Sequence, residues 1–190
     1  MAHETARRIT FNGAHHVAFR CRDAEQTRWF YEDVLGLPLA AALIIEAVPG
    51  THEDTPYLHM FFEVGDGKYL AFFDEPTKTT AQWFGRKDSF DMHYAIEARS
   101  EQDLLAMQAR INAAGKSCVG PIDHGFVRSV YMYDPNGIQV EITLRTDRHD
   151  AIMAEEAGHA RDQIAEWGRR TRETKIAKFG EAELSKRGSR

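Results

Sequence analysis

The feature that most constrains the fold is a layout that occurs twice. Each half of the first 145 residues contains a strand, an amphipathic helix and three more strands, and the offset from His16 to His93 is 77 residues. A fixed period of this kind predicts two copies of one supersecondary unit that bury a core together. We therefore expect an α+β fold of two tandem βαβββ modules, at about residues 12–76 and 88–145, in one domain of residues 1–146.

Alternation and capping residues locate the elements. "GAHHVAFRCRD" alternates with period two, which predicts a strand, and the next segment has apolar residues at helical spacing between Asp23 and Gly36. Ser100 and Gly115 bound the second predicted helix in the same way, with Leu104, Leu105, Met107, Ile111 and Ala114 expected to face inward. The other predicted strands cover about residues 38–48, 57–64, 69–74, 90–100, 117–122, 126–134 and 138–145.

The composition changes after about residue 147. The segment 147–190 is polar and helix-prone, with a thin apolar stripe of Ile152, Ala160, Ile164 and Trp167. We expect one helix, packed on the domain or on a partner subunit, followed by a loose tail.

The net charge of −5 disfavours nucleic acid and anionic membrane surfaces, which select basic faces. The sequence shows neither an apolar signal region nor the run of about 20 apolar residues that spans a membrane. Cys21 and Cys118 lie far apart on probable strands, and reduced thiols are expected. A cytoplasmic location is the resulting expectation.

Two histidines occupy the same place in the two modules. His16 and His93 each precede a helix-capping residue by seven positions. A single strand histidine is more often structural, but matched placement favours ligation of a metal ion. Strand alternation should send the neighbouring His15 to the opposite face, so only one of the two can enter a shared cavity.

A carboxylate completes the candidate metal site. Glu141 lies between Val140 and Ile142 in a β-branched strand. A buried, unpaired carboxylate is costly, so such a residue needs a cation or strong hydrogen bonds, unless that face of an edge strand is wet. Two histidines and one carboxylate are the ligands of non-haem Fe(II) sites with open positions, and Zn(II) sites use the same ligand types.

The segments "HHVAFRCRDAEQTRWFYEDVLGLPL" and "IDHGFVRSVYMYDPNGIQVE" resemble the vicinal-oxygen-chelate superfamily of glyoxalases, bleomycin and fosfomycin resistance proteins, epimerases and extradiol dioxygenases. The resemblance covers about residues 12–145. It implies a curved open barrel with a metal ion in its concave centre. The second segment is similar to the signature of one-domain extradiol ring-cleavage dioxygenases.

That resemblance implies an Fe(II) enzyme, with Mn(II), Zn(II) or Ni(II) as alternatives, that cleaves a catechol-like ring with O2. Glu141 would be the metal carboxylate, and His124 and Tyr131 would touch the substrate or oxygen. The family's acid-base histidine on the fourth strand is missing here, and His59 is the nearby candidate. A glyoxalase-like isomerase, lyase or epimerase and a non-catalytic drug-binding protein are the alternatives. A homodimer is expected because many relatives dimerise.

Overall fold

The computed structural model describes residues 10–187 of the 190-residue chain. The chain divides into two compact units. Of the described residues, one unit contains 10–123 together with Arg128–Leu144, and the other contains His124–Val127 together with 145–187.

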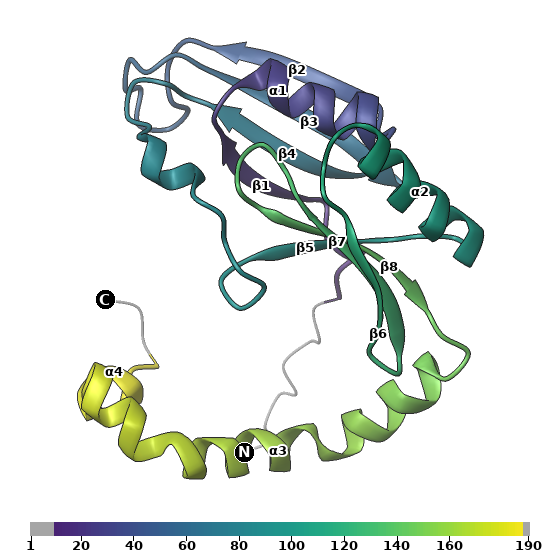
Figure 1. Ribbon diagram of the computed structural model, residues 1–190. Coiled ribbons are helices and arrows are strands. Elements are labelled where there is room, and N and C mark those ends of the chain that lie inside the picture. Colours follow the sequence, from purple (N-terminus) through teal and green to yellow (C-terminus); the bar gives the residue numbers. More distant parts are fainter. Residues whose placement is uncertain (1–9, 188–190) are drawn as a thin grey trace. The chain divides into compact units, whose positions relative to one another are not determined.

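The first module begins with β1 (His16–Cys21) and α1 (Ala24–Arg28), which continues as a π-helical turn, η1 (Trp29–Val34). Strands β2 (Leu39–Ile45), β3 (Tyr57–Gly65) and β4 (Lys68–Asp74) follow. The sheet has the order β1-β4-β3-β2, in which β1 runs parallel to β4 and the other pairs are antiparallel (Figure 1).

The second module repeats this arrangement. After the short helix η2 (Ala81–Phe84) come β5 (His93–Glu97), α2 (Glu101–Ala113), β6 (Val119–Asp123), β7 (Val127–Tyr133) and β8 (Gln139–Arg145). The sheet order is β5-β8-β7-β6, and β5 runs parallel to β8. The two βαβββ modules predicted from the 77-residue offset are therefore confirmed.

The helix boundaries follow the predicted capping residues. The side chains of Asp23 and Ser100 each accept a hydrogen bond from a backbone N–H three residues further on. Gly36 and Gly115 follow the two helical segments with φ angles of 78° and 80°, a conformation that glycine adopts without strain.

Both modules contribute to one apolar core, which lies on the helix-facing side of the sheets. Leu104 and Ile111 of α2 are completely buried in it. Leu105 was expected to face inward as well, but its side chain is 43% exposed. It directly follows Leu104, and successive helical residues point about 100° apart, so the two do not share a face.

The C-terminal residues form α3 (His149–Phe179) and the short α4 (Glu181–Ser185). The helix expected after residue 147 thus extends to Phe179. Ion pairs between residues three or four positions apart stabilise α3. Glu166, for example, lies 2.7 Å from Arg169 and 2.6 Å from Arg170. No helix among residues 10–187 is both long and apolar enough to cross a membrane.

Candidate metal centre

The second sheet brings together two of the three predicted metal ligands. His93 is the first residue of β5, and Glu141 lies on β8 opposite Ala95. Nε2 of His93 lies 3.5 Å from Oε2 of Glu141. The side chain of Glu141 is only 9% exposed, whereas that of His93 is 42% exposed. The predicted buried carboxylate is therefore found beside an accessible imidazole.

A backbone carbonyl orients the His93 ring. Nδ1 of His93 lies 3.0 Å from the carbonyl oxygen of Ser89, and because a carbonyl only accepts hydrogen bonds, Nδ1 carries the proton. In a neutral ring, Nε2 then presents a lone pair to the Glu141 carboxylate. Two acceptors at this distance need a proton or a cation between them. This donor set fits a divalent metal ion.

The hydroxyl of Tyr131, on β7, donates to Oε1 of Glu141 at 3.1 Å. Burial is the main factor that raises the pKa of Tyr131, and the negative charge of Glu141 adds to it. The phenol therefore keeps its proton at neutral pH. One oxygen of the carboxylate is held by this proton, and the other oxygen faces His93.

The structure does not bring His16 to these residues. His16 begins β1, and its Nδ1 lies 2.9 Å from Nδ1 of His15. His15 precedes the strand, so the alternation expected to separate the two rings does not apply to it. Among residues 10–187, no three His, Cys, Asp or Glu side chains are gathered closely enough to hold a metal ion. The role of His16 as a ligand stays a prediction.

The strand registers nevertheless place His16 and His93 at equivalent positions. His16 pairs with Tyr69 on β4, and His93 pairs with Gln139 on β8. Two residues further along the last strand of each module stand Ala71 and Glu141, so the first module has an alanine where the second has its carboxylate. A fourth protein ligand from this position is excluded.

The two acidic residues at the end of β4 have other partners. Asp74 accepts a hydrogen bond from the backbone N–H of Ala24 at 2.8 Å. Glu75 is held by Arg20 at 2.7 Å and by backbone N–H groups of the following loop. Hydrogen bonds from Thr77 and then Arg20 lower the pKa of Glu75 to about 2. Both carboxylates therefore have structural roles.

The proposed acid-base residue His59 lies on the face of the first sheet that carries His16. It pairs with Phe73 across β3 and β4, and its ring stacks on that residue at 3.9 Å with an interplanar angle of 8°. Phe61 lies two residues further along β3, and the centroid of its ring is 4.2 Å from the centroid of the His59 ring. Nδ1 of His59 donates to the carbonyl of Phe72 at 3.1 Å. These contacts position the ring, and its catalytic role stays a prediction.

His124 follows β6 and belongs to the second compact unit. Its backbone N–H donates to the carbonyl of Val127 at 2.9 Å, which closes the tight turn between β6 and β7. Its predicted contact with substrate or oxygen stays a prediction.

Sequence reasoning missed the network that holds the loop before β8. Oδ1 of Asp134 accepts the N–H groups of Asn136 and Ile138 at 2.8 Å each, and Oδ2 accepts the Tyr31 hydroxyl at 3.0 Å. Asn136 in turn donates to Thr27 at 3.1 Å. The motif Asp-Pro-Asn-Gly predicted only a turn. Its buried side chains in fact join the two modules next to the strand that carries Glu141.

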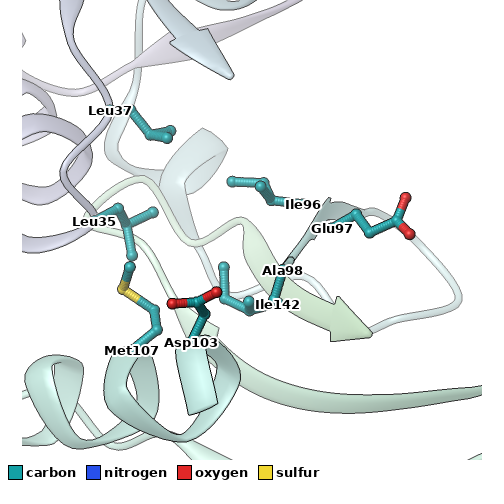
Figure 2. A pocket seen from close by; sticks show the side chains of 8 residues that line it. All are labelled: Leu35, Leu37, Ile96, Glu97, Ala98, Asp103, Met107 and Ile142. Carbon is teal, nitrogen blue, oxygen red and sulfur yellow. The ribbon is translucent and has the colours of Figure 1, made fainter. Parts of the chain in front are cut away.

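An apolar groove lies elsewhere (Figure 2). Ile142 and Ile96 both line the groove. Ile142 directly follows Glu141, and Ile96 directly follows Ala95, which pairs with Glu141 across the two strands. Successive strand residues point to opposite faces, so the groove lies on the other face of the sheet from Glu141 and His93. Its lining residues are Leu35, Leu37, Ile96, Glu97, Ala98, Asp103, Met107 and Ile142.

Comparison with known structures shows the same fold. A glyoxalase/dioxygenase from Nostoc punctiforme is 26% identical, with a TM-score of 0.54 over 72% of this chain and 92% of that one. The fosfomycin resistance protein FosX from Listeria monocytogenes, in complex with Mn(II), is 15% identical, with a TM-score of 0.54 over 75% and 99%. Lactoylglutathione lyase from Agrobacterium tumefaciens is 21% identical, with a TM-score of 0.50 over 71% and 95%.

No curated protein sequence matches the chain significantly. The sequence profile of one superfamily matches residues 13–142, which include both modules. Because this match spans more than half of the chain, the protein belongs to the Glyoxalase/Bleomycin resistance protein/Dioxygenase superfamily, that is, the vicinal-oxygen-chelate superfamily.

Proposed function

We propose that the protein is a non-haem Fe(II)-dependent extradiol-type dioxygenase that cleaves a catechol-like ring with O2. One observation carries the proposal. Nε2 of His93 lies 3.5 Å from Oε2 of Glu141, and the hydroxyl of Tyr131 donates to the second oxygen of the same carboxylate. The resemblance to extradiol enzymes singles out two of these residues, Tyr131 and Glu141, and the repeat of the two modules singles out His93.

The donor types fit iron of the two-histidine, one-carboxylate kind. His93 and Glu141 would hold the ion, with His16 as the proposed third ligand. A backbone carbonyl on Nδ1 of His93 fixes the tautomer that aims the other nitrogen at a metal. Bound Fe(II) supplies the Lewis acid and redox centre at which a catechol and O2 meet. Ala71, at the position equivalent to Glu141, supports a site with three protein ligands and open positions.

Tyr131 supplies a proton at a defined atom. Because its pKa is raised, the phenol stays protonated while it orients Glu141. The same O–H can donate to a substrate oxygen on which negative charge develops. His59 donates through Nδ1 to Phe72, so Nε2 remains the acceptor nitrogen of its neutral ring, which suits a base that removes a catechol proton.

The first sheet supports an aromatic substrate. His59, Phe61 and Phe73 form a set of flat rings on the face that also carries His16, and the Phe61 ring lies 5.7 Å from the His16 ring. Aromatic rings prefer offset or edge-on contacts with other rings over this range of distances. Such a wall suits a planar ring better than an extended polar chain.

The test uses the full chain purified without oxygen, loaded with Fe(II) and supplied with a panel of catechols. We expect stoichiometric iron, oxygen uptake and a ring-opened product. Glu141→Gln keeps the shape of the side chain but removes its charge, so bound iron should fall at least about tenfold. His159→Ala, an exposed residue of α3, is the matched control and should keep its iron.

Full iron loading without oxygen uptake on any catechol would refute the dioxygenase proposal. Turnover that needs Ni(II), Co(II) or Zn(II) and proceeds without oxygen would favour an isomerase, lyase or epimerase instead. Ligand binding by a protein that takes up no metal would identify a non-catalytic binder.

A further inference from the structure

One face of α3 carries a regular seam of apolar and small residues. These residues are spaced alternately by four and three positions, which is the seam pattern of a two-stranded coiled coil. They are Met153, Ala157, Ala160, Ile164, Trp167 and Thr171. The larger members are open to solvent, since Met153 is 48%, Ile164 73% and Trp167 60% exposed.

Apart from ion pairs between its own residues, the helix has few contacts that stabilise it. None of its 31 residues is buried. Its interior contains Gly158 and Gly168, and each glycine costs about 1 kcal/mol relative to alanine in a helix. Most of the stability of a protein helix comes from packing of its apolar face. The seam therefore requires a partner surface.

We propose that α3 pairs in antiparallel fashion with α3 of a second copy of this chain, about a twofold axis near residue 162. This register places each large seam residue opposite a small one. The facing pairs are Ile164 with Ala160, Trp167 with Ala157, and Met153 with Thr171. A parallel pair would instead set Trp167 against Trp167 and Ala157 against Ala157, which gives an uneven separation of the two helices.

Charges beside the seam favour the same arrangement. Glu156 and Arg170 flank it on one side, and the antiparallel register brings Glu156 of each copy next to Arg170 of the other. Within one chain, Arg169 and Arg170 both pair with the single carboxylate of Glu166. This turn therefore carries a net positive charge, which can attract a carboxylate of the partner helix. Arg161 of the two copies would meet on the opposite side of the seam, where exposure to solvent weakens their repulsion.

The first test is the self-association of the full chain, measured by sedimentation equilibrium. We expect a dimer whose association constant falls at least about tenfold in Glu156→Arg and in Arg170→Glu, because each change removes two attractions and adds two repulsions. The double variant should recover most of the affinity. Glu155→Arg makes the same charge change one residue away, off the seam, and should associate like the unchanged chain.

The second test determines helix direction. Under mild oxidation, Gln163→Cys lies near the proposed axis and should form a disulfide-linked dimer, whereas Thr171→Cys should not. Cys21 and Cys118 are buried and do not compete. A linked dimer of Thr171→Cys would overturn the antiparallel register. A monomeric chain, or a dimer indifferent to Glu156 and Arg170, would overturn the proposed interface altogether and assign the seam to another surface.

Discussion

The buried hydroxyl of Tyr31 gives the sharpest test of how the fold presents the candidate site. The ring is almost completely buried, with centroid distances of 4.9 Å to Phe72 and 5.5 Å to Phe62. Its hydroxyl donates across the two modules to Oδ2 of Asp134 at 3.0 Å. Tyr31→Phe keeps the packing and removes only this donor. The effect therefore isolates one inter-module hydrogen bond.

The magnitude follows from what Asp134 loses. The side chain is 3% exposed, so water cannot readily replace the hydroxyl. A buried acceptor that loses a partner costs about 1–3 kcal/mol, with charged groups at the upper end, so we expect a loss of about 2–3 kcal/mol in the free energy of unfolding. For a chain of this size that corresponds to a fall in Tm of roughly 4–12 °C.

The effect should also depend on pH. Burial is the main factor that raises the pKa of Asp134, so its contribution to stability is greatest below the ordinary carboxyl pKa and is lost as pH rises through the raised value. A protonated Asp134 needs the Tyr31 donor less than a charged one does. The difference between Tyr31→Phe and the unchanged protein should therefore be larger at neutral pH than at about pH 4.

Denaturant unfolding at both pH values measures the effect. Tyr57→Phe is the matched control, because Tyr57 is a half-buried strand residue whose ring contacts Phe73 at 5.7 Å, and it should change stability by less than about 0.5 kcal/mol. If Tyr31→Phe is no more destabilising than this control at neutral pH, the hydroxyl does not stabilise Asp134 and the reasoning fails.

Three further predictions concern single groups. The proposed function predicts that Tyr131→Phe retains bound iron but lowers kcat by about 10²-fold or more, because the change removes the proposed proton donor and leaves the proposed ligands in place. Single-turnover kinetics with metal analysis would check both parts. Burial raises the pKa of Cys21 to about 12 and that of Cys118 to about 11, so a thiol reagent at pH 8 should label neither until the protein unfolds; rapid labelling of the native chain would contradict this. Glu75, with a pKa of about 2, should stabilise the fold above its ordinary pKa of about 4.5 and lose that contribution as pH falls toward 2, so unfolding of Glu75→Gln should depend less on pH over this interval.

The sequence was sufficient to predict the fold because several local signals agree. Capping residues, C-terminal glycines and strand alternation recur in both modules, and the 77-residue offset predicts their pairing into two like sheets. The same offset selected His93, and the β-branched surroundings of Glu141 selected its carboxylate. The structure brings these two side chains to 3.5 Å.

Other features depend on contacts that have no local pattern. The π-helical turn η1 continues α1, although its residues have ordinary helical spacing. The role of Ser89 in orienting His93 comes from a backbone carbonyl, which any residue type could supply. The pairing of Tyr31 with Asp134 joins residues 103 positions apart, and neither side chain reveals the other in the sequence.

The two modules have the same strand register but different chemistry, and this difference bears on how a site between like halves can work. In the second module Tyr131 contacts Glu141; at the corresponding place in the first, Phe61 pairs with Ala71. In the proposed site the carboxylate and the hydroxyl proton thus come from one sheet, while the other sheet would offer the imidazoles of His16 and His59 together with apolar rings. A symmetric pair of carboxylates would neutralise a divalent ion and occupy more of its positions. In the proposed iron site, one carboxylate would leave positive charge on the ion, which would favour an anionic bidentate oxygen ligand such as a catecholate, and the apolar rings of the first sheet would favour its aromatic ring.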